Sequence, residues 1–166
     1  MPDSTAAEPA PVVPALAAPT VEGVRAAWEV ARLWLPAFVA GRRADESVYA
    51  PGVSTWHNVG EWEAPIRSTP SRRRRMDAGA DLSVEDVKCR VFDGGFVVQA
   101  VTVGTSTSGA RVRVPTCLVV TVIDGRIARF EEYADSAAST ALFGAADGAG
   151  PDEVAAAVRA EHNQHP

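Results

Sequence analysis

The 166-residue sequence has few of the residues from which metal sites and disulfide frameworks are built. It holds two cysteines, Cys89 and Cys117, and three histidines, and it contains neither a CxxC nor an HExxH motif. Structural and catalytic zinc sites use such residues at close, regular spacings, so we expect no bound metal. Both cysteines fall in segments predicted to be strands, which favours two buried, reduced thiols over a disulfide scaffold.

Long apolar runs and an excess of positive charge are also missing. No stretch approaches the roughly 20 uninterrupted apolar residues that span a bilayer, and residues 1–20 hold no basic residue of the kind that opens a secretory signal. We therefore expect a cytoplasmic protein without membrane contact. The net charge is −5, from 16 basic and 21 acidic residues. Because nucleic-acid binding needs a broad cationic surface, we expect no nucleic-acid partner.

Composition divides the chain into one folded domain with an appendage at each end. Residues 1–19 hold five prolines and little that could pack, which predicts a disordered tail. A glycine-rich stretch at 144–150 precedes a weak helix at 151–162, so we assign 144–166 as a linker and terminal helix. The domain itself is predicted to span residues 20–143.

The domain is predicted to begin with an amphipathic helix at residues 21–40. Apolar residues recur there at spacings of three and four, and Thr20 suits the N-cap position. Trp28 and Trp34 are predicted to pack in the core. Pro36 removes one hydrogen bond inside this helix, so we expect a kink or a restart there.

The second half of the domain is typical of an antiparallel meander. Its most specific signal is Asp124-Gly125, a two-residue pair that favours a type I′ hairpin. Asp135 suits the N-cap of a short apolar helix at 136–143. Upstream, Pro51-Gly52 is predicted to punctuate the chain before a strand, and residues 61–70 are predicted to be irregular. The predicted strands are 53–58, 84–92, 96–105, 111–123 and 126–133.

Four consecutive arginines at 72–75 form one strongly basic stretch within a predicted short polar helix at 71–80. Four neighbouring residues point around most of a helix circumference, so these side chains cannot all line one groove. Two interpretations stay open, a solvated surface and a contact with an anion or a partner.

These elements predict an α+β fold. A long N-terminal helix would be wrapped by a curved, cone-shaped antiparallel sheet of four to six strands, which leaves a pocket between sheet and helix. Long strands with few charges on one face suit the lining of such a pocket.

Two sequence blocks resemble the nuclear transport factor 2-like superfamily, within its SnoaL-like and ketosteroid-isomerase-like branch. The first block is YAPGVSTWHN at 49–58, and the second is DGRI at 124–127 running into EEYADSA at 131–137. The resemblance covers residues 21–143 and implies a nuclear transport factor 2-like or cystatin-like roll. It also implies a homodimer, since a second copy usually covers the exposed face of such a sheet. Enzymes and binding modules share this fold, so the pocket residues must decide the function.

The resemblance points to His57 and Glu132 as the pair that carries chemistry. Ketosteroid isomerases place an aspartate base where His57 stands, and histidine is also a residue type that removes protons near neutral pH. Proteins similar to limonene epoxide hydrolase place an acid where Glu132 stands. Because strand residues alternate faces, Glu132 shares a side with Phe130, and the resemblance implies that this is the pocket side. Glu131 would point away, with a solvated charge as the alternative to a role in the site. The alternative for His57 is a structural hydrogen bond to a neighbour.

Other parts of these catalytic sets are missing from the sequence. Residues 21–40 contain no tyrosine and residues 117–123 contain no carboxylate, so the oxyanion hole of a ketosteroid isomerase is not formed by these segments. Residues 96–103 contain Gln99 but lack the arginine and aspartate of the epoxide hydrolases. SnoaL-like polyketide cyclases need little more than a carboxylate or histidine that removes an acidic C–H proton, and His57 with Glu132 meets that need.

We therefore expect a domain that binds a small, mostly apolar molecule and transfers protons without a cofactor. His57 would act as base, Glu132 as the partner acid or base, and Gln99 as an orienting hydrogen-bond group. The alternative function is a non-catalytic module that binds a small molecule or a protein partner. Further ligand contacts are expected from Tyr49, Trp56, Trp62 and Arg67, for which the alternatives are core or dimer-interface packing of the aromatics and a surface salt bridge of the arginine.

Overall fold

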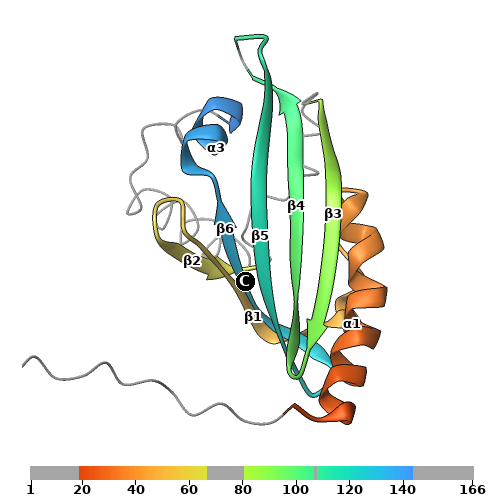
Figure 1. Cartoon of the computed structure of the whole chain (residues 1–166). Helices are drawn as coiled ribbons and strands as arrows, with labels where there is room; N and C mark the ends of the chain where they lie inside the picture. Colours follow the sequence, from red (N-terminus) through yellow and green to blue (C-terminus); the bar gives the residue numbers. More distant parts are fainter. Residues whose placement is uncertain (1–18, 67–80, 107, 144–166) are drawn as a thin grey trace, which may run out of the picture.

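The computed structural model describes residues 19–66, 81–106 and 108–143, in which one long helix packs on one face of a six-stranded sheet (Figure 1). The strand order is β2-β1-β6-β5-β4-β3. Neighbouring strands are antiparallel except β1 and β6, which run parallel. The elements are α1 (Val21–Val39), a 3-10 turn (Glu46–Val48), β1 (Tyr49–His57), β2 (Trp62–Pro65), β3 (Leu82–Phe92), β4 (Gly95–Thr105), β5 (Arg111–Ile123), β6 (Arg126–Ala134) and α3 (Ser136–Phe143).

The predicted α+β fold is confirmed. The predicted helix at 71–80, the arginines at 72–75, and the predicted appendages, apart from residue 19, lie outside the described residues. None of the helices in the described part of the chain is long and apolar enough to cross a membrane.

Helix α1 is fixed at its start by polar contacts. The Thr20 hydroxyl accepts a hydrogen bond from the Gly23 amide at 3.0 Å, as the predicted N-cap. The Thr20 amide donates to Asp93 Oδ2 at 2.7 Å, which ties the helix to the turn between β3 and β4. A Cβ atom on Gly23 would lie 1.6 Å from Asp93 Oδ1, so only glycine allows this close approach. The helix then continues through Pro36 to Val39 without ending at the proline.

The two tryptophans of α1 differ in burial, and the prediction was right for one of them. Trp34 is 6% exposed and its ring contacts Phe96 and Phe130 at centroid distances of 5.7 and 5.4 Å. Trp28 is 51% exposed, so its predicted place in the core is wrong. The buried stripe of α1 passes through Ala27, Val30, Ala31 and Trp34. Trp28 lies beside this stripe, where Arg32 covers its ring.

The structure differs from the predicted strands in two places, because pairing with a neighbouring strand outweighs the local sequence signals. One strand begins earlier than predicted, and one was not predicted. Strand β1 begins at Tyr49, and Pro51-Gly52 forms an irregularity inside it, with Gly52 at φ +74° and a register shift between Tyr49 and Ser54. Strand β2 falls in the segment predicted to be irregular, and it pairs antiparallel with β1. The predicted hairpin between β5 and β6 is confirmed, since Asp124 and Gly125 both have positive φ. So is the predicted cap of α3, where the Ala138 amide donates to Asp135 Oδ1.

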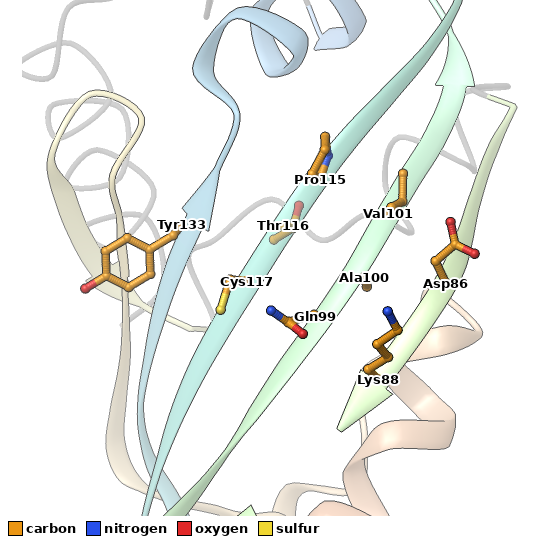
Figure 2. Close-up of a pocket in the computed structure, with 9 residues that line it drawn as sticks. All are labelled: Asp86, Lys88, Gln99, Ala100, Val101, Pro115, Thr116, Cys117 and Tyr133. Carbon is orange, nitrogen blue, oxygen red and sulfur yellow. The ribbon is translucent and has the colours of Figure 1, made fainter. Parts of the chain in front are cut away.

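We call the face of the sheet that packs on α1 the inner face, and the opposite face the outer face. The inner face supplies most of the core, including the fully buried Phe96, Val98 and Val120. Because side chains alternate along a strand, Gln99 and Cys117 lie on the outer face (Figure 2). Cys89 and Cys117 are free and only half-buried, which refines the expectation of two buried thiols.

The two tryptophans offer a matched test of the core. Trp34→Ala is expected to lower the free energy of unfolding by about 3–5 kcal/mol, because it leaves a large cavity among aromatic rings. Trp28→Ala removes the same residue type from the exposed side of the same helix and is expected to cost less than about 1 kcal/mol. Urea denaturation followed by circular dichroism measures both, and equal losses would contradict this description of α1.

Candidate functional site

His57 and Glu132 lie side by side at the ends of the two parallel strands. The β1–β6 ladder pairs Thr55 with Phe130 and then His57 with Glu132, so all four lie along one stretch of the inner face. His57 Nδ1 is 2.8 Å from Glu132 Oε2. An ionised carboxylate only accepts hydrogen bonds, so Nδ1 is the protonated nitrogen and donates to Glu132. The two side chains are 15% and 29% exposed, so the pair is half-buried.

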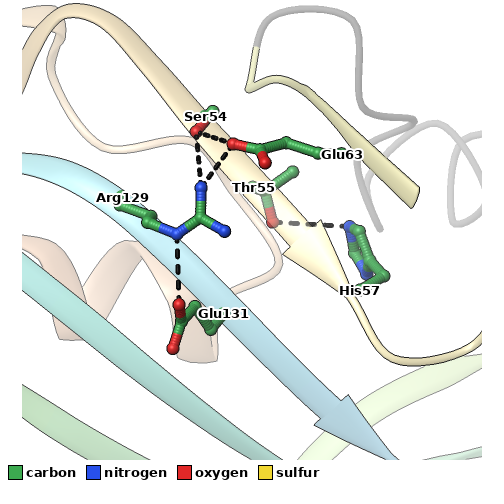
Figure 3. Close-up of polar contacts among 6 residues, drawn as sticks. All are labelled: Ser54, Thr55, His57, Glu63, Arg129 and Glu131. Carbon is green, nitrogen blue, oxygen red and sulfur yellow. Dashed lines mark hydrogen bonds and ion pairs between the residues drawn. The ribbon is translucent and has the colours of Figure 1, made fainter. Parts of the chain in front are cut away.

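Two further residues hold the imidazole of His57. Its Nε2 lies 3.4 Å from the Thr55 hydroxyl, a long hydrogen bond between residues on the same face of β1 (Figure 3). Trp62 stands directly opposite His57 in the β1–β2 ladder, and the two rings stack with centroids 4.0 Å apart and an interplanar angle of 20°. Both ring nitrogens and one ring face of His57 are therefore engaged.

Asn58 fastens the ends of the two strands together. Its backbone N–H donates to the backbone carbonyl of Glu132 at 3.0 Å. Its side chain donates to the Ala134 carbonyl at 3.0 Å and accepts from the Ala134 amide at 2.8 Å. The carboxamide thus extends the β1–β6 ladder where backbone pairing stops, and it fixes the backbone on both sides of the His57–Glu132 pair.

Next to the pair, the inner face continues as an apolar wall. Glu132 pairs with Leu118 on β5, and Leu118 pairs with Val98 on β4. These two side chains are 7% and 0% exposed. Thr116, 8% exposed, adds a hydroxyl group beyond Leu118. The described part of the chain contains no group of three or more His, Cys, Asp or Glu side chains that could hold a metal ion.

The structure brings three of the predicted site residues together, His57, Glu132 and Trp62. It does not bring Gln99 to them. Gln99 is exposed on the outer face of β4, where its side-chain oxygen accepts a hydrogen bond from Arg90 at 2.9 Å. The physical reason is strand alternation, since its neighbours Val98 and Ala100 point into the core.

The other predicted contacts are also separated from the pair. Trp56 lies on the outer face, where its ring contacts Tyr133 at a centroid distance of 5.4 Å. Tyr49 is a buried core residue, as one alternative held; its ring contacts Phe130, its hydroxyl accepts from the Ala44 amide, and burial raises its pKa. Arg67 lies outside the described residues. The sequence analysis assigned no site role to Thr55 or Asn58, although both lie in the block at 49–58 that contains His57.

A polar network on the outer face links β1, β2 and β6 (Figure 3). Arg129 on β6 donates to Glu63 on β2 and, at 3.1 Å, to Glu131. The Ser54 hydroxyl on β1 donates to Glu63 at 2.6 Å. The Ser54 hydrogen bond, followed by the Arg129 guanidinium, holds the pKa of Glu63 below its ordinary value. Glu131, expected to be a solvated charge, is therefore part of an ion-pair network, and three strands are linked.

The Asn58 clamp predicts a local loss of order. Asn58→Ala removes two side-chain hydrogen bonds, each with a net value of about 0.5–1.5 kcal/mol, so we expect unfolding to become easier by about 1–3 kcal/mol. We also expect the Ala134 amide hydrogen to exchange faster in the variant than in the wild type. The Val120 amide, in the middle of the sheet, is the internal reference and should change less. Exchange at Ala134 that equals the wild-type rate would show that the clamp does not hold the strands.

The lowered pKa of Glu63 predicts a pH-dependent contribution to stability. Its folded pKa lies below the unfolded value of about 4.3, so the contribution is complete above that value and is lost as pH falls through the folded pKa. Because Glu63 is largely exposed, we expect Glu63→Gln to cost only about 0.2–1 kcal/mol at pH 7. The difference between the two proteins should shrink as pH falls below the unfolded value and disappear at a pH below the folded pKa. Urea denaturation across this pH range measures it, and a constant difference would contradict the assignment.

Comparison with known proteins identifies the fold. No protein-family model matches the sequence, and no curated protein matches it. Among solved structures, an NTF2-like protein from Burkholderia xenovorans is 15% identical over 71% of this chain and 96% of its own, with a TM-score of 0.50. AclR, a proposed hydroxylase from Streptomyces galilaeus, is 11% identical over 70% of this chain and 83% of its own, with a TM-score of 0.53. A protein proposed to be a SnoaL-like polyketide cyclase, from a Jannaschia species, is 19% identical over 71% and 92%, with a TM-score of 0.46. The chain therefore has the nuclear transport factor 2-like fold that its two sequence blocks predicted.

Proposed function

We propose that this domain binds a small, mostly apolar molecule on the inner face of its sheet and transfers a proton to or from it. The observation that carries the proposal is the 2.8 Å hydrogen bond between His57 Nδ1 and Glu132 Oε2, in a half-buried position. An imidazole and a carboxylate held at this distance can store and release a proton within one site.

The surroundings of the pair support an apolar ligand. Leu118, which pairs with Glu132, and Trp62, which covers one face of the imidazole, are the apolar side chains next to the pair. Small-molecule sites in proteins are mostly apolar, with a few oriented polar groups. The polar groups here are oriented, because backbone pairing, Asn58 and the ring stack fix them before any ligand arrives.

The reaction class that fits this pair is cofactor-independent acid/base chemistry. The pair can remove a proton from an acidic C–H bond next to a carbonyl group, as an isomerase or a cyclase requires, or activate a water molecule, as a hydrolase requires. The resemblance to SnoaL-like cyclases favours the first of these, because that chemistry needs the fewest additional residues.

A generic substrate for proton abstraction tests the proposal. 5-Nitrobenzisoxazole loses one C–H proton to a base while its N–O bond breaks, and the coloured nitrophenolate product is followed by absorbance. We expect the wild-type protein to accelerate this reaction over buffer, and the double variant His57→Gln/Glu132→Gln to lose about 10²-fold or more of that acceleration. Glu131→Gln, on the same strand but the outer face, is the matched control and should keep the wild-type rate.

The non-catalytic alternative gives a different result in the same experiment. A binding module would take up the compound without turnover, and the bound compound would shift the NMR methyl signals of Leu118 while the rate stayed at that of buffer. Turnover that persists in the double variant would contradict the proposed site.

We also propose that a second copy of the chain covers the outer face of the sheet. Tyr133 is 44% exposed there, and it borders a shallow groove of about 510 Å³ whose lining includes Val101, Pro115 and Cys117 (Figure 2). Val101→Glu places a charge in the centre of this surface without disturbing the inner core. Sedimentation velocity should show a dimer for the wild type and a monomer for the variant, whereas a monomeric wild type would contradict the proposal.

A further inference from the structure

We propose that Glu132 is the residue that touches the reacting molecule, and that His57, held by Thr55 and Trp62, acts through it as a positioning residue. This division of roles rests on the proposed function. It assigns the catalytic contact to the carboxylate and not to the imidazole, and it gives a function to Thr55.

Exposure increases from Thr55 through His57 to Glu132. Thr55 is 5% exposed, and its ladder partners Ala64 and Phe130 are each 4% exposed, so its hydroxyl lies against the core. The His57 side chain is 15% exposed and that of Glu132 is 29% exposed. The hydrogen-bonded chain Thr55–His57–Glu132 therefore runs from the core outward, with the carboxylate at its accessible end.

The contacts of the imidazole point the same way. Nδ1 donates to Glu132, so Nε2 is the nitrogen that can act as a base when the ring carries one proton. Nε2 faces the Thr55 hydroxyl at 3.4 Å, on the buried side. Trp62 covers one face of the ring from the adjacent strand. Because the Glu132 side chain is the more exposed of the two, it is the one that a ligand from solvent contacts more readily.

The carboxylate has the capacity for both contacts. A carboxylate has two oxygens, each with more than one acceptor position, and His57 donates to Oε2. That bond fixes the orientation of the carboxylate, as second partners fix catalytic groups in other sites. In the reaction, a ligand C–H proton moves to a Glu132 oxygen, and the electron pair of that bond stays on the ligand. The proton returns to the product or to water, and the carboxylate is restored.

Single variants separate the two roles on 5-nitrobenzisoxazole. Glu132→Gln is expected to lose about 10²-fold or more of the acceleration, because the base itself is removed. His57→Gln is expected to lose only about tenfold, because the base remains but is less well oriented. Its remaining rate should still rise with pH in the acidic range in which a carboxylate loses its proton.

Thr55 provides the second part of the test. Thr55→Val keeps the shape of the side chain but removes the hydroxyl, and it should reproduce part of the loss seen in His57→Gln. Thr55→Ser retains the hydroxyl and should restore most of the rate. Circular dichroism confirms that each variant is folded, and Thr55→Ala replaces Thr55→Val if the latter does not fold.

The possible results distinguish this inference from the proposed function. A loss in Glu132→Gln at least tenfold greater than that in His57→Gln supports the inference. Equal losses, or a greater loss in His57→Gln, overturn it and leave His57 as the base, so that the proposed function stands. A wild-type protein that does not accelerate the reaction overturns the proposed function and this inference with it. A Thr55→Val variant with the full wild-type rate removes Thr55 from the mechanism.

Discussion

The parallel pairing of β1 with β6 is the constraint on which the site depends. It is the one parallel contact in the sheet as described, and it joins the two sequence blocks at 49–58 and 124–137. In a parallel ladder, residues that pair share a face, so His57 and Glu132 point to the same side once Thr55 pairs with Phe130. Phe130 is anchored in the core by Trp34 and Tyr49. The packing of the helix thereby fixes the register that brings the imidazole to the carboxylate.

The outer face of these strands holds a stabilising polar network, and the inner face holds the candidate site. The outer face holds the network of Ser54, Glu63, Arg129 and Glu131, which links β2, β1 and β6. The inner face holds the chain from Thr55 to Glu132. Because side chains alternate, each strand contributes to both faces with consecutive residues. Trp56 and His57 are neighbours in sequence, yet one packs on Tyr133 outside and the other on Trp62 inside.

Because this fold hosts many activities, the function must be inferred from the residues of this site. The two solved structures with TM-scores of 0.50 and 0.53 are 15% and 11% identical to the chain, and they establish the fold and not the reaction. The proposed chemistry rests on this chain's own residues, a half-buried carboxylate that is hydrogen-bonded to an imidazole. Asn58, whose carboxamide continues the ladder, keeps that arrangement in place at the strand ends.

The sequence by itself determined the elements whose signals are local. The periodicity of α1, its Thr20 cap, the Asp124-Gly125 hairpin and the Asp135 cap each depend on a few adjacent residues, and the structure confirms them. Alternation, which is also local, grouped Glu132 with Phe130, and the family resemblance indicated that this side points inward. Tertiary structure alone decided the contacts between segments distant in the sequence. It formed β2 by pairing it with β1, exposed Trp28, put Gln99 on the far face, and set Thr55 and Trp62 around His57. These features depend on which strand lies beside which and in what register, and that choice is made by the packing of the whole core rather than by any short stretch of residues.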